Sequence, residues 1–268
     1  MDMEFVLMIV GAGGTGGNFA KEFARYMASF YKRGRSIKAV LIDGDRIEKK
    51  NVDRQPFLKE DLNQSKAEIL TEAIQENFEL RDFKCYPHYI TTPEQLKGLF
   101  SDIKCNDGDT VCIPVIIGCV DNHRARQCMH EFFESEKTCI YVDSANEFSV
   151  GEVVIGIRLD GREIAPDRCF YYPDVLTDDS PSAEEQSCGV VNMEKPQHLA
   201  TNLQAANILL SVIVNIVSEN ILKGGIIYFD REKYFSRFQP YEDAMKNTKM
   251  EEDTGLEKDR KEKEKGSV

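Results

Sequence analysis

The sequence predicts an α/β fold: a Rossmann-like, mostly parallel sheet with helices on both faces and an antiparallel C-terminal extension. Two observations predict it. Up to residue 142, continuously apolar strand candidates alternate with amphipathic helix candidates, as in sheets whose strands are buried on both faces. Beyond that point the rhythm changes, and two late strand candidates are separated only by a short turn, which is typical of a hairpin.

The composition excludes several classes of protein. Of 268 residues, 41% are hydrophobic and 30% charged, a balance typical of a globular protein with a sizeable core. The formal net charge of −12 disfavours nucleic acids and anionic membranes as partners, because phosphate groups attract a basic surface. The sequence has no apolar run of about 18 residues and no signal-like start, so we expect a cytoplasmic protein with reduced cysteines and no membrane span.

The elements follow from the spacing of apolar residues, taken in chain order. The first of them form a βαβ unit: a strand over residues 5–10, a glycine-rich turn, a helix that ends near residue 31 and a strand over residues 37–42. Pro114 predicts a local irregularity in a later buried strand. Further helices are expected over residues 65–78, 122–133 and 198–220, and further strands over 84–90, 111–120, 138–142, 150–157, 226–229 and 234–238.

The expected domain spans residues 1–240. Within it, residues 159–187 are rich in Pro, Asp and Ser and carry no periodicity, so they predict a long mobile connection. The tail, residues 241–268, is dominated by charged residues and has almost no large apolar ones. We expect this tail to be disordered, because it cannot bury enough apolar surface to offset its ordering entropy.

A glycine-rich turn follows the first strand directly. Gly11, Gly13 and Gly16 fit the pattern G-x-G-x-x-G, placed between a strand and a helix. Such glycines allow a tight turn and a close approach of phosphate to the backbone, and the helix N-terminus presents free N–H groups. The pattern therefore predicts a nucleotide site without specifying the nucleotide.

A polar segment after the second strand makes this prediction more specific. Asp43, at the strand end, is placed to accept hydrogen bonds from ribose hydroxyls. A dinucleotide-dependent dehydrogenase would need that acid, but it would leave Asn51, Arg54 and Gln55 in the next loop without a function. The guanidinium of Arg54 offers a planar fork for phosphate oxygens. The segment therefore indicates a site for more negative charge than a pyrophosphate carries, such as a triphosphate.

Two further charged residues are candidates for the same site. Lys66 is expected near the N-terminus of helix 65–78, where it would add a mobile positive charge; the alternative is solvated surface charge. Asp121 follows strand 111–120, at the sheet edge where ligands of parallel sheets bind. A carboxylate there can hold Mg²⁺ together with phosphate oxygens. The alternative is that Asp121 caps the helix that begins at Asn122.

The order of these motifs resembles that of the ThiF/MoeB family of ubiquitin-activating-enzyme-like adenylyltransferases. G-A-G-G-T-G is followed by D-G-D-x-I-E-x-x-N-x-x-R-Q, by Lys66 and by D-N-x-x-A-R, within residues 5–157. Residues 143–146 and 151–156 are most similar to ThiF-like proteins of the PRTRC type. The resemblance implies that the C-terminal carboxylate of a ubiquitin-like β-grasp protein attacks the α-phosphate of ATP and yields an acyl-adenylate and pyrophosphate. It also implies a homodimer.

The resemblance assigns roles to the candidates. Asp43 would bind the ribose and Asp121 the magnesium ion, whereas Asn51, Arg54 and Lys66 would contact phosphates. Because two anions must meet, cationic groups and Mg²⁺ are needed to neutralise charge at the phosphorus, and an ionised carboxylate needs no general base. The residues expected to bind nucleotide are Gly11, Gly13, Gly14, Gly16, Asp43, Asp45, Asn51, Arg54, Gln55, Lys66 and Asn122.

Cys188 is a candidate acyl acceptor, since some relatives carry a cysteine in this region that takes over the acyl group as a thioester; a structural thiol is the alternative. The chain departs from the family in lacking paired C-x-x-C motifs, so no structural zinc is expected. It also lacks the N-terminal arginine segment of many relatives. Two rivals therefore stay open: a catalytically weak nucleotide-binding scaffold and an NAD(P)-dependent oxidoreductase. Surface or capping roles, rather than metal binding, are expected for His88, His123, His130 and His198.

Overall fold

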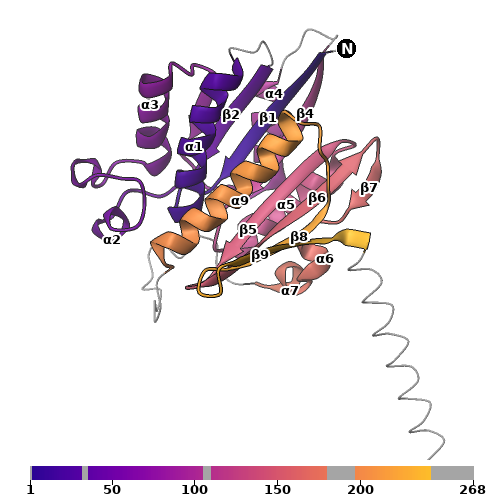
Figure 1. The fold of residues 1–268 in the computed structure, drawn as a ribbon. Helices are drawn as coiled ribbons and strands as arrows, with labels where there is room; N and C mark the ends of the chain where they lie inside the picture. Colours follow the sequence, from indigo (N-terminus) through magenta and orange to yellow (C-terminus); the bar gives the residue numbers. More distant parts are fainter. Residues whose placement is uncertain (1, 32–35, 105–109, 180–196, 243–268) are drawn as a thin grey trace, which may run out of the picture.

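A sheet with strand order β3-β2-β1-β4-β5-β6-β8-β9, to which β7 adds beside β6, is the framework of the computed structural model (Figure 1). The model describes residues 2–31, 36–104, 110–179 and 197–242. The strands are β1 (Asp2–Val10), β2 (Ser36–Ile42), β3 (Phe83–Tyr86), β4 (Thr110–Gly118), β5 (Cys139–Asn146), β6 (Val150–Leu159), β7 (Arg162–Ala165), β8 (Gly225–Asp230) and β9 (Phe235–Pro240).

The sheet has a parallel part and an antiparallel part. Strands β3, β2, β1, β4 and β5 are parallel neighbours. Strands β6, β8 and β9 then continue the sheet in antiparallel pairing, and β8 and β9 form the predicted hairpin. This arrangement confirms the predicted fold class. It also brings the carboxyl ends of β1, β2, β4 and β5 to one edge of the sheet.

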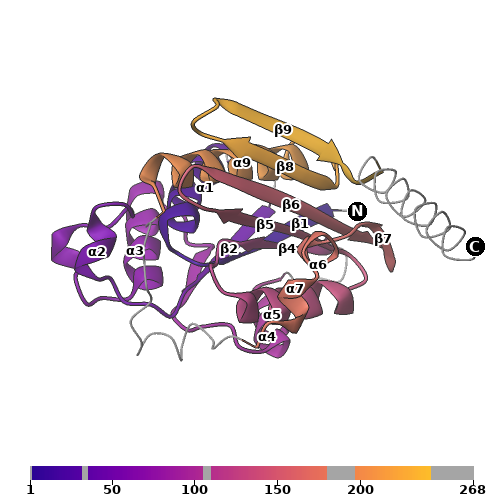
Figure 2. The ribbon, with the colours of Figure 1, turned by 90° about the horizontal axis from the view of Figure 1, so that it is seen from below.

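Helices cover both faces of the sheet (Figure 2). Helices α1, α3 and α9 pack on one face, and α4 and α5 pack on the other. The helices are α1 (Gly14–Tyr31), α2 (Lys49–Val52), α3 (Lys66–Phe78), α4 (Pro93–Ile103), α5 (His123–Ser135), α6 (Arg168–Tyr171), α7 (Asp174–Thr177) and α9 (Leu199–Val217), with a 3₁₀ turn at Lys59–Asp61.

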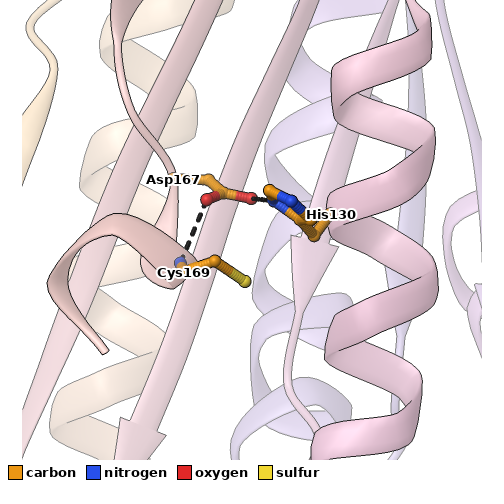
Figure 3. A group of neighbouring side chains, drawn as sticks. All are labelled: His130, Asp167 and Cys169. Atoms are coloured by element: carbon orange, nitrogen blue, oxygen red, sulfur yellow. Dashed lines mark hydrogen bonds and ion pairs between the residues drawn. The ribbon is translucent and has the colours of Figure 1, made fainter. Parts of the chain in front are cut away.

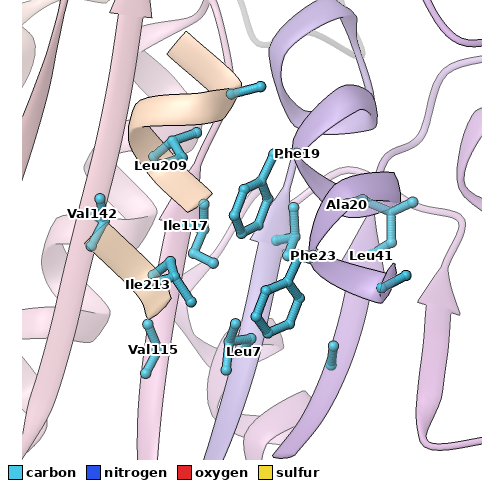
Figure 4. Close-up of a cluster of buried hydrophobic side chains, with 14 of the residues drawn as sticks. Leu7, Phe19, Ala20, Phe23, Leu41, Val115, Ile117, Val142, Leu209 and Ile213 are labelled. Carbon is cyan, nitrogen blue, oxygen red and sulfur yellow. The ribbon is translucent and has the colours of Figure 1, made fainter. Parts of the chain in front are cut away.

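The sequence of β1 is continuously apolar because both faces of this strand are buried. Side chains of successive strand residues point to opposite faces, and here both faces are buried. Leu7 contributes to the cluster under α1 and α9, and its neighbour Met8 to the cluster under α4 and α5. In Figure 4 the rings of Phe19 and Phe23 on α1 reach toward Leu7 and Ile117 of the sheet, with Ile213 of α9 beside them. The helix that follows the glycine turn is thus anchored in the core.

Helix α9 is long and apolar enough to span a membrane by length and composition. More than half of it, 56%, is buried inside the molecule, where it packs against α1, β5 and β6. Its apolar character is therefore that of a core helix.

Several elements depart from the sequence expectations. Residues 160–179 were expected to be an aperiodic connection, but they hold β7, α6 and α7, whose short length leaves no periodicity to detect. Helix α4 was not predicted either, although Thr92 and Gln95 form a capping box and Pro93 occupies the first turn. Pro114 lies in a continuous strand, one residue before β4 begins to pair with β5, so the missing N–H breaks no bond in that ladder.

Candidate functional site

The backbone around the glycine turn leaves no room for side chains at Gly11 and Gly16. Gly11 has a φ of 101°, and a Cβ there would lie 2.5 Å from the carbonyl oxygen of Cys119. A Cβ on Gly16 would lie 1.9 Å from the oxygen of Gly11. At Gly13, by contrast, a Cβ would meet only the Nε2 of Gln55, at 3.9 Å. Gly13 therefore marks the open side of the turn, from which a ligand can approach the start of α1.

Asp43 ties the glycine turn to the loop after β2. Its Oδ2 accepts a hydrogen bond from the backbone N–H of Ala12 (2.6 Å), and its Oδ1 accepts one from that of Asp45 (2.7 Å). Burial raises the pKa of Asp43 to about 6, partly offset by the positive charge of Lys66. The carboxylate that was predicted to bind ribose thus lies between the two predicted motifs.

Lys66 lies at the N-terminus of α3 as expected and is not a solvated surface charge, so that alternative is wrong. It is the first residue of α3, its side chain is only 7% exposed, and its Nζ lies 2.7 Å from Oδ2 of Asp45. The hydroxyl of Tyr89 donates to the other oxygen of Asp45. Burial would raise the pKa of Asp45, but the charge of Lys66 and the hydrogen bonds from Lys66 and Tyr89 outweigh it, so the pKa is lowered.

The loop that carries Asn51, Arg54 and Gln55 lies against the turn. Asn51 is buried, and its Oδ1 accepts from the backbone N–H of Glu48, which caps α2. Gln55 lies beside Gly13, and its Oε1 is buried without a hydrogen-bond partner among the described residues. Such an orphaned acceptor is costly unless a ligand or water satisfies it. Arg54 is half-buried next to Gln55, and its phosphate role stays a prediction.

Asp121 and Asn122 have different surroundings. Asn122, not Asp121, is the N-cap of α5: its Oδ1 accepts from the backbone N–H of Ala125 at 2.8 Å. The capping alternative for Asp121 is therefore wrong. Asp121 is exposed, and it follows β4 at the edge where Gly11 packs against Cys119. Its carboxylate is free of capping duty, and its metal role stays a prediction.

A pocket of about 450 Å³ adjoins the Asp43 loop. Gly44 lines one part of it, and residues from the end of β3 to the first turn of α4 line the rest, among them Tyr86, His88 and Tyr89. Aromatic rings in such a pocket suit a flat heterocycle. No periodicity of the sequence indicates this pocket, although the clustered Y-P-H-Y at residues 86–89 could have done so.

The sequence also did not predict a chain of hydrogen-bonded side chains on the other side of the turn. The hydroxyl of Thr15 donates to Oδ1 of Asn146 (3.0 Å), and Nδ2 of Asn146 donates to Oδ1 of Asn202 (2.8 Å). Nδ2 of Asn202 is buried without a partner among the described residues, and it fills the space that a Cβ on Gly14 would need. Thus α9 closes the site from the side of β5.

Behind the Asp121 loop lies a buried ionic network. Asp143 is 1% exposed and accepts hydrogen bonds from Arg126 (3.2 Å) and from Arg168. Arg168 also pairs with Glu152 at 2.8 Å. Arg126 donates to the carbonyl oxygen of Val120 at 2.7 Å, which fixes the backbone just before Asp121. Sequence spacing could not have revealed this network, because its members come from α5, β5, β6 and α6.

The remaining candidates are Cys188, the charged tail and the histidines. Cys188 lies outside the described residues, and so does most of the predicted tail. His198 caps α9 as expected, since its Nδ1 accepts from the backbone N–H of Ala200. His130, expected at the surface or in a cap, is instead half-buried and paired with Asp167.

Comparisons with known proteins agree with this fold. The model of the ThiF family matches residues 4–253. Solved structures of PaaA (TM-score 0.60, 16% identity) and of E. coli MccB with ATP (TM-score 0.58, 13% identity) have the same fold. They align with 89% and 88% of this chain, which spans only 64% and 63% of theirs. MccB has also been solved with AMPCPP and MccA (TM-score 0.58, 15% identity, 88% and 63% covered). No curated protein matches the sequence.

Proposed function

The chain belongs to the ThiF family, and from this premise we propose that it binds Mg-ATP at the glycine turn and adenylates the C-terminal carboxylate of a polypeptide. A ubiquitin-like β-grasp protein is the substrate we favour. One observation carries the proposal: Asp43 bridges the glycine turn and the Asp45 loop, and Lys66 is held beside them. A ligand at this edge would meet helix N–H groups, a carboxylate and a buried cation together.

The nucleoside half of ATP fits the region around Asp43. An ionised Asp43 can still accept hydrogen bonds from ribose hydroxyls, because each of its oxygens has a second lone pair besides the one that the backbone uses. The adjoining pocket, walled by Gly44 and Tyr89, would take the base. Tyr89 would then lie between the pocket for the base and the loop that binds the ribose, because its ring lines the pocket and its hydroxyl bonds to Asp45.

The triphosphate would lie over the open face of the turn. Gly13 leaves room there, and the first N–H groups of α1 point toward an incoming anion. Lys66 would exchange its bond to Asp45, which is 43% exposed, for a phosphate oxygen. The Nε2 of Gln55 lies near Gly13, where it can donate a hydrogen bond to a phosphate oxygen.

Asp121 is the residue that would hold magnesium. It is an exposed carboxylate at the same sheet edge and has no capping duty, and Mg²⁺ favours one or two carboxylates plus phosphate oxygens and waters. The ion would neutralise charge as the substrate carboxylate meets the α-phosphate. The anchored backbone before Asp121, held by Arg126, suits this role because it limits how far the carboxylate can move.

The polypeptide would enter from the side of Asn146 and Asn202. Asn146 is half-buried on this side and is held by Thr15 and by the enclosed Asn202, so its amide is placed to meet the carboxylate of a chain terminus. MccB, a neighbour in fold, has been solved with ATP and with MccA, which supports the pairing of ATP with a second substrate. The expected homodimer, and a later transfer of the acyl group to Cys188, belong to this proposal as further steps.

A nucleotide-binding scaffold is the second candidate. The observation that favours it is that Lys66 and Asn51 already have partners within the chain, in Asp45 and in the cap of α2. A scaffold would bind ATP without turnover. An oxidoreductase is not proposed further, because the family assignment accounts for the loop residues that it leaves without a function.

Exchange of labelled pyrophosphate into ATP separates the two candidates. With a β-grasp protein that ends in glycine as substrate, we expect exchange by the wild type and a loss of about 100-fold or more in Asp121→Ala, because magnesium would no longer be held. Asp102→Ala, which removes an exposed acid from the end of α4, is the matched control and should exchange normally. ATP binding without exchange for every such substrate would favour the scaffold, and full exchange by Asp121→Ala would refute the metal assignment.

A further inference from the structure

Three side chains of metal-binding types meet between α5 and α6. His130 lies two turns into α5, Asp167 is the N-cap of α6, and Cys169 lies in α6. Nδ1 of His130 is 2.8 Å from Oδ2 of Asp167. The donor atoms of all three residues lie within 4.8 Å of one another, and Figure 3 shows the three side chains converging.

The backbone around this group is fixed by its surroundings. Oδ1 of Asp167 accepts from the backbone N–H of Cys169 at 3.0 Å. Asp167 also packs directly on Gly156 of β6, where a Cβ would lie only 2.9 Å from its Cα. Between the two ligands, Arg168 is paired with Asp143 and Glu152 in the buried network. The spacing of Asp167 and Cys169 is therefore set by the fold before any ion arrives.

We propose that His130, Asp167 and Cys169 form a binding site for a divalent transition-metal ion, with zinc as the best match to a nitrogen, oxygen and sulfur donor set. Bonds of about 2.0–2.3 Å in a tetrahedral site separate neighbouring donor atoms by roughly 3.2–3.8 Å. One pair of donor atoms, on His130 and Asp167, is 2.8 Å apart, and all three lie within 4.8 Å of one another. The donors are therefore already gathered around one point.

Burial and accessibility fit a three-ligand site with one open position. Asp167 is 3% exposed and Cys169 4%, so two ligands are inside the protein. The side chain of His130 is 22% exposed, which leaves a path for the ion and room for a water as fourth ligand. The site differs from the paired C-x-x-C ligands whose absence led us to expect no structural zinc, and it goes beyond the proposed adenylation.

A nucleophilic role for Cys169 is less consistent with the structure. Burial raises the pKa of its thiol, and a thiol inside the protein offers no route for an acyl group. A metal ion, by contrast, reaches the sulfur as a small cation and deprotonates a thiol that it binds. The chemistry therefore favours a metal ligand over an acyl acceptor.

Cobalt titration of the full-length, reduced and metal-free protein tests the site, because Co²⁺ reports both thiolate ligation and tetrahedral geometry by absorption. We expect one equivalent of Co²⁺ to give a thiolate-to-cobalt charge-transfer band and tetrahedral visible bands, and one equivalent of Zn²⁺ to remove them. Cys169→Ser should lose the charge-transfer band, and His130→Gln should weaken binding by about tenfold or more. Cys85→Ser, which removes a half-buried thiol from β3, is the control and should behave like the wild type.

The outcomes are decisive in both directions. The proposal is wrong if the wild type gives no thiolate band, or if Cys169→Ser gives the same band as the wild type. Circular dichroism of each variant shows whether it folds. If Cys169→Ser does not fold, His130→Gln carries the test, since glutamine retains a hydrogen-bonding group toward Asp167 and its partly exposed position tolerates change.

Discussion

Two groups of charged residues, one at the sheet edge and one inside the fold, contain the same kinds of side chain and differ in what surrounds them. At the edge, Lys66 pairs with an Asp45 that is 43% exposed. Inside, Arg168 pairs with an Asp143 that is 1% exposed. An exposed partner can be exchanged for a ligand at little cost, whereas an enclosed one cannot. The comparison shows that the burial of the acid, more than the identity of the two residues, distinguishes an ion pair that can bind a ligand from one that only stabilises the fold.

The largest expected effect is on the enclosed pair. Arg168→Met leaves Asp143 with Arg126 alone and Glu152 without this cation, and removing one partner of a buried ion pair costs about 3–5 kcal/mol. We therefore expect the free energy of unfolding, measured in urea, to fall by that amount. Arg162→Met, which removes an exposed arginine from β7, should change it by less than about 0.5 kcal/mol. Equal effects of the two substitutions would break the comparison.

The edge pair should respond in the opposite way. In Lys66→Met the partner Asp45 keeps its hydrogen bond from Tyr89 and its contact with water. The free energy of unfolding should therefore change by about 1 kcal/mol or less. Pyrophosphate exchange should fall by about 100-fold, because a cation beside the phosphates is lost. A large loss of stability together with unchanged exchange would assign Lys66 to the structure instead of the site.

The smallest expected effect concerns Asp43 and pH. Its pKa is raised to about 6, chiefly by burial, so the carboxyl group becomes protonated as the pH falls through that value. A protonated group is a weaker acceptor for ribose hydroxyls, and we expect ATP affinity to drop about tenfold between one pH unit above this value and one unit below it. Calorimetric titration measures this drop. Asp43→Asn should bind weakly at both pH values, and a wild-type affinity that is flat across the range would contradict the role.

The sequence could predict features that are local in the chain. The glycines of the turn and Asp43 lie within one βαβ unit, where the strand that precedes each motif fixes its place at the sheet edge. The sequence could not predict contacts made across long separations. Arg168 meets Asp143 over 25 residues, and His130 meets Asp167 over 37, and no spacing rule links such positions. The burial of Lys66 and its bond to Asp45 could not be predicted, because Asp45 lies on a loop whose path only the fold determines.

The unequal packing of the glycines also offers a tool. Gly11 and Gly16 admit no side chain, but a Cβ on Gly13 would make only an ordinary contact with Gln55, and the backbone conformation there is ordinary. A bulky residue at Gly13 would therefore block the proposed nucleotide site while leaving the core beneath it undisturbed. Under the proposed function, cells that carry this variant would show which roles of the protein need ATP binding and which need only the folded chain.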